Sequence, residues 1–422
     1  MTDILTQTIL SNGLKVLLKE IHTAPIISSW LWYRVGSRDE IQGRTGVSHW
    51  VEHMQFKGTE QFPANILDKV ISREGGSWNA STSIDSTRYY ETMPADKIDL
   101  ALRLEADRMV NSEFKEEEVE SERTVIISER EGNENEPLFL LGEAVQQAAF
   151  RIHPYHHEVI GDMPDLRSMT REDLYNHYRT FYVPNNAVMA VAGDFDKESM
   201  LVRIRELFEP ISSGPEPRRL ARQEPRQKGE LRLSVEGPGE VTYIQVVYHF
   251  PPASHPDFFP LTVLDSLLAG SSGLSNKTSR LYRALVDKEY AINVSGWTEP
   301  TIDPFIYQVT LINHPQRKPE EVLAVLDYEM KRIQDKLVLE EEIDRAIKQA
   351  RAVFAYRTEI ITNQAFWLGY AEMFADYSWF ETYLDKLSAV TAKDVQRVAN
   401  EYFRPQSRVV GTYIPLGGKV AA

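Results

Sequence analysis

Two histidines and a glutamate lie close together in the first half of the chain, in the segment His49-Trp50-Val51-Glu52-His53. On a helix, residues four apart share a face, so both imidazoles can bind one metal ion. Glu52 lies about 100° round the helix from His53, where its carboxylate can reach a metal-bound water without binding the ion itself. This HxxEH order is the inverse of the commoner HExxH zinc motif. The alternative is a solvated helix face that carries two unrelated histidines.

A catalytic zinc site needs a third protein ligand and leaves one position for water. The acidic helix predicted over residues 116–131 is the candidate source of that ligand. Glu122 and Glu129 are seven residues apart and therefore lie within about 20° of each other on one face. Many acids typically mark an exposed helix, but Val125 and Ile126 indicate that part of this one is buried. A carboxylate near the buried part needs a partner, and a cation is suited to that role.

A second group of histidines consists of His153, His156 and His157. Pro154 and Gly161 predict a loop there, without the fixed spacing that a helix gives to ligands. We therefore predict packing or surface histidines, with an independent metal site as the less favoured alternative. The chain has no cysteine, so any metal must be held by His, Asp or Glu.

One pattern occurs twice in the chain, at an offset of 221 residues. Residues 170–184 and 391–405 each predict a capped helix that ends in aromatic residues and a proline, and a β-strand follows each copy. Between the copies, residues 211–229 hold three prolines and two glycines and show no helical or strand period, which predicts a linker. The sequence thus predicts two homologous domains: 1–210, which carries the metal site, and 230–422, which does not.

Each half combines clustered strands with clustered long helices. Alternating patterns predict strands at residues 14–19 and 26–35 in the first half, and at 231–235 and 242–250 in the second. Strands and helices that cluster separately favour an α+β fold, and we expect each half to be a mainly antiparallel sheet packed with helices.

Composition restricts the kinds of partner. The chain has a net charge of −15, whereas a nucleic-acid partner requires a clustered basic surface. The charge fits either ordinary solubility or an acidic chamber that favours basic peptides. No apolar run is long enough to span a bilayer, and the first ten residues lack the basic start and apolar core of a signal peptide. These features predict a cytoplasmic protein with no membrane partner.

Residues along nearly the whole chain follow one known pattern. They are Asn12-Gly13-Leu14, His49 to His53 with Met54, Phe56, Lys57, Gly58 and Thr59, Gly75 to Ala80, Asp85, Thr87, Tyr89, Glu122-Arg123, Glu129, and Ser279-Arg280-Leu281-Tyr282. In this combination the sequence resembles the pitrilysin-like family of inverted-motif zinc metallopeptidases (inverzincins, peptidase family M16). Its length is similar to that of the short bacterial branch, which resembles mitochondrial processing peptidase subunits.

The resemblance implies a zinc endopeptidase that binds one zinc ion per chain. It implies that Glu129 is the third ligand beside His49 and His53, that Glu52 activates the zinc-bound water, and that Glu122 orients the site from behind the ligands. It further implies an edge strand to which a peptide substrate adds, formed by Gly75, Gly76, Ser77, Trp78, Asn79 and Ala80. In such proteins two homologous halves form a clamshell chamber that admits unfolded or short peptides.

The sequence departs from the family pattern at one place. Self-sufficient members carry an arginine and a tyrosine, seven residues apart, after the Ser-Arg-Leu segment, and the positions in register here are Val286 and about Ile292. This departure resembles the metal-bearing subunit of two-subunit members and predicts a heterodimer whose homologous partner supplies the Arg/Tyr pair. Arg283 and Tyr290 are also seven apart, shifted from that register, so a homodimer stays open.

Two other functions compete with a peptidase. A non-catalytic peptide-binding or structural subunit of a related complex is the first, although such subunits typically lose metal ligands and this chain keeps all of them. The second is a hydrolase that uses the same metal site on non-peptide substrates. The expected edge strand favours peptides, because its backbone groups suit an extended main chain.

Overall fold

The computed structural model describes residues 5–270 and 277–417, which form two compact units. Unit 1 contains residues up to 130, 157–221 and 357–380, and unit 2 contains 131–156, 222–356 and the residues from 381 on. The chain passes between the units at 221–222, inside the linker expected at 211–229, and at four other places. The units therefore differ from the contiguous domains 1–210 and 230–422, because each unit includes a segment from the other half of the chain.

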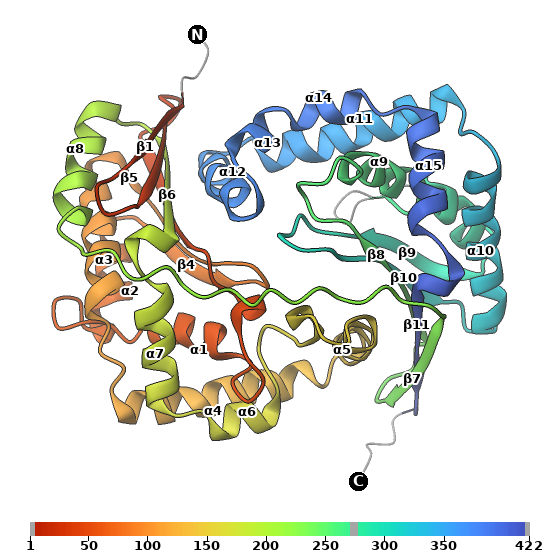
Figure 1. Ribbon diagram of the computed structural model, residues 1–422, viewed down its shortest axis with the longest axis horizontal. Coiled ribbons are helices and arrows are strands. Elements are labelled where there is room, and N and C mark those ends of the chain that lie inside the picture. The colour runs from red at the N-terminus through yellow and green to blue at the C-terminus, as the bar shows by residue number, and fades with distance from the viewer. Residues whose placement is uncertain (1–4, 271–276, 418–422) are drawn as a thin grey trace. The chain divides into compact units, whose positions relative to one another are not determined.

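The sheet of unit 1 has six strands in the order β1-β2-β6-β3-β5-β4 (Figure 1). Only β2 and β6 pair in parallel, and the other neighbours are antiparallel. The strands are β1 (Thr6–Ile9), β2 (Lys15–Glu20), β3 (Ile26–Tyr33), β4 (Ser77–Thr82), β5 (Thr87–Pro94) and β6 (Ala187–Gly193). Its helices are α1 (Val47–Met54), α2 (Ala64–Arg73), α3 (Ile98–Asn111), α4 (Glu116–Asn133), α6 (Met163–Ser168), α7 (Arg171–Phe181), α8 (Lys197–Phe208), α12 (Ile361–Phe374) and α13 (Tyr377–Glu381), with short turns η1 (Ser37–Asp39), η2 (Ala95–Lys97) and η4 (Pro184–Asn186).

The sheet of unit 2 has five strands in the order β7-β11-β8-β10-β9, and again one pair, β7 with β11, is parallel. The strands are β7 (Leu231–Gly237), β8 (Tyr243–Phe250), β9 (Ala291–Trp297), β10 (Phe305–Asn313) and β11 (Arg408–Pro415). The helices are α5 (Pro137–Ala149), α9 (Phe258–Leu268), α10 (Pro319–Asp335), α11 (Glu340–Arg357), α14 (Tyr383–Ser388) and α15 (Ala392–Tyr402), with turns η3 (Pro154–His156), η5 (Tyr282–Val286) and η6 (Pro405–Ser407). Both units are thus mainly antiparallel sheets with helices, which confirms the expected fold class.

The repeat predicted at an offset of 221 residues is present in both units. The helix α7 begins after Thr170 and α15 begins after Thr391, and each threonine side chain accepts a hydrogen bond from the backbone of the aspartate three residues later. In both copies the helix runs for 11 residues, and a short turn and a buried strand follow it. A reciprocal cap of this kind satisfies backbone donors that the helix itself cannot satisfy.

Each sheet is covered by a helix from the other half of the chain. In unit 1, α12 packs on β3 and β6, and a Cβ on Gly369 would lie 2.1 Å from Nε1 of Trp32. In unit 2, α5 packs on β11, where a Cβ on Gly411 would lie 2.3 Å from a methyl group of Val145. A glycine at each contact lets the helix approach the sheet closely. Sequence patterns show that such a helix has an apolar face but not which sheet it covers.

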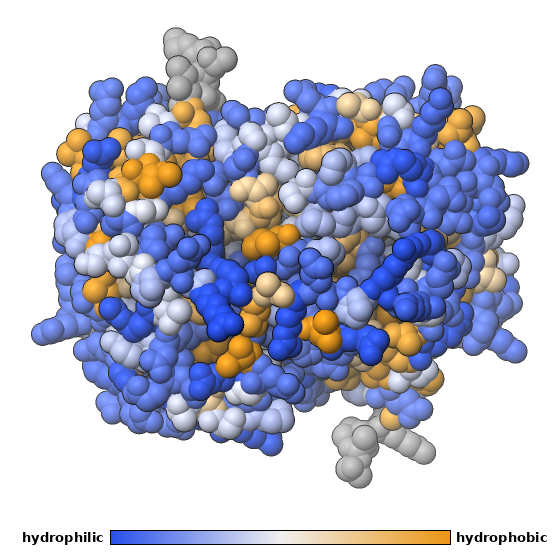
Figure 2. Space-filling view, viewed as in Figure 1, coloured by the Kyte–Doolittle hydropathy of each residue, from blue (hydrophilic) through white to orange (hydrophobic). Residues whose placement is uncertain are grey.

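The surface in Figure 2 is mostly hydrophilic on the face shown, and its hydrophobic residues lie in small separate groups. Within the residues that the structure describes, no helix is both long and apolar enough to cross a membrane.

Candidate metal centre

The helix α1 carries the HxxEH segment and begins at Gly46, whose φ of 85° lies in the left-handed region. A Cβ at this position would lie 2.3 Å from the carbonyl oxygen of Ile160, so the start of the helix requires glycine. The buried carboxylate of Glu40 accepts hydrogen bonds from the backbone N–H groups of Gly46 and Ser48, each at 2.8 Å. These contacts satisfy donors at the N-terminus of α1 and fix the start of the helix that carries both histidines.

The helix α4 brings a third potential ligand to the two histidines. Donor atoms of His49, His53 and Glu129 all lie within 4.8 Å of one another. The Oε2 atom of Glu129 is 3.9 Å from Nε2 of His49 and 3.8 Å from Nε2 of His53. Glu129 is 44% exposed at its side chain, so this carboxylate can adjust toward an ion without a repacking of the core.

This donor set fits zinc. Zinc sites of hydrolases combine imidazole nitrogens and a carboxylate at about 2.0–2.2 Å and keep one position for water. Burial and the neighbouring His53 lower the pKa of His49 to about 3, so this imidazole is neutral at pH 7, as metal binding requires. In the part of the chain that the structure describes, the group of His49, His53 and Glu129 is the one cluster of three such side chains close enough to hold an ion.

Glu122 lies on the other side of the His53 ring. Its Oε1 atom is 2.8 Å from Nδ1 of His53, and its Oε2 atom pairs with the ammonium group of Lys57. Burial alone would raise the pKa of Glu122, but the hydrogen bonds from His53 and Lys57 lower it overall. An ionised Glu122 accepts the Nδ1 proton and so directs the lone pair of Nε2 toward Glu129. Helix periodicity alone placed Glu122 and Glu129 on one face, but they lie at different nitrogens of the His53 ring, Glu122 at Nδ1 and Glu129 at Nε2.

Glu52 is buried and is held by the end of β4. The hydroxyl group of Thr82 donates to Oε2 of Glu52 at 2.7 Å, and the backbone N–H of Thr82 also donates to this carboxylate. Burial raises the pKa of Glu52 although both hydrogen bonds oppose that shift. A carboxylate with a raised pKa is a better proton acceptor from water, as a general base must be.

The expected substrate strand lies at a free edge of the sheet of unit 1. Among the described residues, β4 pairs only with β5. It begins at Ser77, so Gly75 and Gly76 precede the strand and do not belong to it. The N–H of Ala80 donates to its neighbour Asn79 at 2.9 Å, and the N–H of Thr82 donates to Glu52. Alternate N–H groups of β4 therefore face away from β5, toward the edge where an added strand would pair.

The burial predicted within α4 is found for one residue and not for the other. Within α4, Ile126 is buried as predicted, but Val125 is 48% exposed, so that part of the burial prediction is wrong.

Two members of the second histidine group are buried. Nε2 of His153 lies 3.2 Å from Oδ2 of Asp303, and Nδ1 of His157 lies 3.7 Å from Oε2 of Glu40. His153 and His157 are thus packing histidines, as predicted.

The positions expected for an Arg/Tyr pair lie in unit 2. Val286 ends η5, a turn of π-helix, and Ile292 lies on the edge strand β9 with 51% of its surface exposed. The guanidinium carbon of Arg317 lies 4.5 Å from the centre of the Tyr290 ring. Tyr290 already has a cationic partner within its own unit, while Arg283 is exposed.

Three residues at the site were not assigned a role from the sequence: Glu40, Lys57 and Thr82. Glu40 lies seven residues before the first residue of α1. Its carboxyl group reaches the start of that helix because the loop between them folds back on itself. Thr82 ends a strand that is 30 residues from Glu52 along the chain. Lys57 follows His53 by four residues, so helical spacing could have suggested a shared face, but not that Glu122 bridges the two.

Comparison with known families places this geometry in context. Residues 15–163 match the model of the insulinase family (peptidase family M16), and residues 168–350 match that of the peptidase M16 inactive domain. The chain belongs to peptidase family M16. The zinc protease PqqE of Helicobacter pylori is 29% identical over 94% of this chain and 89% of its own length. A probable mitochondrial-processing peptidase subunit beta of Arabidopsis thaliana is 26% identical over 97% of this chain and 78% of its own length.

Solved structures of this family share the fold. A protease from Helicobacter pylori matches with a TM-score of 0.92 and 28% identity, over 98% of this chain and 100% of the other. An M16-like peptidase from Alicyclobacillus acidocaldarius matches with a TM-score of 0.84 and 20% identity, over 98% and 99% of the two chains. The second likeness supports the fold of this chain and no more.

Proposed function

We propose that this member of peptidase family M16 is a zinc-dependent endopeptidase that hydrolyses unfolded or short peptides and binds one zinc ion per chain. The observation that carries the proposal is that His49 and His53 of α1 converge with Glu129 of α4. The buried carboxylate of Glu52 lies on α1 between the two histidines in sequence. Relatives that share 29% and 28% of their residues with this chain are named zinc proteases. The donor set and these names support the same cofactor.

The chain's own residues supply proton transfer and orientation. Zinc, when bound, provides a Lewis acid and lowers the pKa of a coordinated water. Glu52 accepts the proton of the attacking water and later delivers it to the leaving amine. The hydroxyl and N–H groups of Thr82 hold the Glu52 carboxylate in place for both transfers. Glu122 fixes the tautomer of His53, with Lys57 keeping Glu122 ionised.

The free edge of β4 is the proposed binding site for the substrate main chain. An extended peptide can pair with alternate N–H and C=O groups of residues 77–80, which makes binding tolerant of side-chain identity. The same strand ends at Thr82, which contacts Glu52 at 2.7 Å. A peptide in register with β4 is therefore led toward the proposed base. Folded proteins cannot offer a free extended segment, which favours unfolded or short substrates.

The proposal includes a homologous partner subunit and a cytoplasmic location. Self-sufficient members carry an arginine at the position of Val286 and a tyrosine at about the position of Ile292, and this chain has neither residue there, so the partner would supply that pair. The plant relative is itself named as a subunit, which supports an assembly of two related chains. In this proposal the hydrolysis takes place inside a closed chamber.

The decisive experiment separates metal binding from chemistry. Glu52→Gln keeps the shape of the side chain but cannot accept a proton. We expect the variant to retain its zinc, measured by metal analysis, while hydrolysis of a quenched fluorescent peptide falls by about 10²–10⁴-fold. Glu117→Gln on the exposed part of α4 is the matched control and should change neither quantity.

Two outcomes would contradict the proposal. Near-normal hydrolysis by the Glu52→Gln variant would exclude Glu52 as the base. A wild-type protein that binds zinc and peptide but hydrolyses no peptide, with or without a homologous partner, would instead indicate the non-catalytic subunit.

A further inference from the structure

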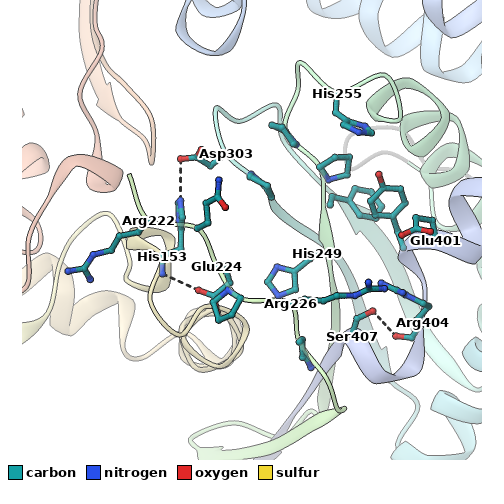
Figure 3. A pocket seen from close by; sticks show the side chains of 18 residues that line it. His153, Arg222, Glu224, Arg226, His249, His255, Asp303, Glu401, Arg404 and Ser407 are labelled. Carbon is teal, nitrogen blue, oxygen red and sulfur yellow. Dashed lines mark hydrogen bonds and ion pairs between the residues drawn. The ribbon is translucent and has the colours of Figure 1, made fainter. Parts of the chain in front are cut away.

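Unit 2 contains a cavity of about 520 Å³ that the metal site does not use (Figure 3). Pockets of roughly 300–1,000 Å³ are the size that holds small organic ligands. One wall is the end of the linker, residues 222–227, and the rest comes from the end of β8, the loop before β10 and the end of α15. The lining combines aromatic and proline surface with histidines and arginines, namely Phe250, Tyr402, Pro225, Pro251, Pro252, Pro304, His153, His249, His255, Arg222, Arg226 and Arg404.

The linker wall is fixed in place by hydrogen bonds within unit 2. The carboxylate of Glu224 accepts the backbone N–H groups of Ile152 and His153, each at 3.0 Å. The amide group of Gln227 donates to the carbonyl oxygens of Gly229 and Arg408, each at 2.7 Å. The pocket is therefore formed before a ligand arrives, which lowers the entropy cost of binding.

The lining also holds three acidic residues, Glu224, Asp303 and Glu401, and within the described part of the chain none of them forms an ion pair with a lining arginine. Glu224 is occupied by the two backbone N–H groups, and Asp303 lies 3.2 Å from Nε2 of His153. Among the described residues, no carboxylate oxygen lies within 4 Å of Arg226 or Arg404. In the view of Figure 3, the side chains of these two arginines point toward one another. No carboxylate of the described residues therefore offsets the charge of either guanidinium group, and an anion in the pocket would be attracted to both.

Arg404 also carries an unsatisfied donor. Its Nε atom is buried and has no hydrogen-bond partner among the described residues. The hydrogen bonds of this guanidinium group are therefore not all made within the described part of the fold. The planar guanidinium group of arginine suits carboxylate and phosphate oxygens, which it binds through paired hydrogen bonds.

We propose that this pocket binds a small organic anion, whose carboxylate or phosphate group bridges Arg226 and Arg404 while its carbon body lies against Phe250, Pro252 and Tyr402. The apolar lining favours a ligand with a carbon skeleton over a bare inorganic ion. The site lies wholly within unit 2 and does not depend on the proposed peptidase activity.

The test is calorimetric titration of the full chain with two probes that share an aromatic body, benzoate and phenyl phosphate, and with neutral benzamide. We expect at least one anion to bind and benzamide not to bind. Arg226→Gln and Arg404→Gln should each weaken the anion at least about tenfold, because each removes a charge-assisted hydrogen bond. The probe that binds more tightly identifies carboxylate or phosphate as the natural group.

Two controls locate the binding. Lys228→Gln lies in the same linker, is exposed and does not line the pocket, so binding should change less than about twofold. His53→Ala removes a proposed zinc ligand and should leave anion binding unchanged. Arg226 is exposed, so its substitution tests the pocket without disturbing the fold. The proposal is overturned if neither anion binds at millimolar concentration, if Arg226→Gln binds like the wild type, or if His53→Ala abolishes binding.

Discussion

The acidic helices α4 and α11 are counterparts in the two halves of the chain, and they differ where chemistry is expected. Both have 18 residues and begin with three glutamates. When their first residues are aligned, the buried Val119 and Ile126 correspond to the buried Ile343 and Ala350. Glu122, which contacts His53, corresponds to the buried Ala346, and the proposed ligand Glu129 corresponds to Val353. The duplicated scaffold is retained, and the ionisable side chains differ.

The same contrast holds for the helices that follow the central strands. The helix α1 buries Val47, Trp50 and Val51 and presents His49 and His53 to Glu129. Its apolar counterpart α9 is buried at every position except Thr262. The packing of the fold therefore does not require the metal site, because unit 2 has a similar sheet-and-helix architecture with an apolar helix instead. The proposed function thus depends on a few side chains added to a repeated scaffold.

The largest expected effect is the loss of zinc from unit 1. His53→Ala and Glu129→Ala should each reduce the metal content from about one zinc per chain to nearly none, because each removes one of three protein ligands. Metal analysis after dialysis measures the loss. Glu341→Ala, an exposed acid at the start of α11, is the matched control and should keep its zinc. Full occupancy in both ligand variants would show that the metal is bound elsewhere.

The next effect concerns what unit 2 lacks. A fixed donor to a developing oxyanion contributes ~3 kcal/mol, roughly a hundredfold in rate. With Val286 and Ile292 at the expected positions, the chain alone should be a weak peptidase, and a homologous partner that carries the Arg/Tyr pair should raise hydrolysis by about that factor. The measurement is a peptide assay during titration of the partner. If the chain alone is fully active and Arg283→Ala or Tyr290→Phe abolishes this activity, the shifted pair is functional and the chain acts as a homodimer.

A smaller effect is expected at Thr82, which holds the proposed base. Thr82→Val keeps the shape but removes the hydroxyl donor to Glu52, and we expect hydrolysis to fall about tenfold while zinc stays bound. Thr82→Ser keeps the hydroxyl group and should retain most of the activity. Steady-state kinetics should place the loss in kcat, because the contact positions a base and not the substrate. An equal loss in both variants would indicate a packing role instead.

The smallest effect compares the two copies of the helix cap directly. Thr170→Ala and Thr391→Ala should each cost about 1 kcal/mol of stability in denaturant unfolding, because both remove the same side-chain acceptor. Only Thr170→Ala should also weaken zinc binding, since α7 packs on α1 through the contact of 3.1 Å between His177 and Ser48. Serine at either position should restore the cap. Equal weakening of zinc binding by both alanine variants would contradict this coupling.

Much of the fold and part of the site could be predicted from the sequence. The capped helices, their proline stops and the following strands depend on contacts within four residues, so Thr170 and Thr391 indicated them directly. The mainly antiparallel α+β fold followed from how strands and helices cluster. The exchange of α5 and α12 between the units did not, because an apolar helix face fits either sheet until the whole core packs.

For this protein, the sequence by itself determined the pairing of His49 with His53, because residues four apart on a helix share a face wherever that helix lies. It also determined the two copies of the capped helix and strand. Helix spacing placed Glu129 and Glu122 on one face, and the family resemblance implied different roles for them. The tertiary structure gave their positions, Glu129 near both Nε2 atoms and Glu122 2.8 Å from Nδ1 of His53. The tertiary structure alone brought Thr82 to Glu52 and the linker to the pocket of unit 2. These contacts join residues far apart in the chain, and their geometry depends on how whole helices and strands pack, which no local spacing specifies.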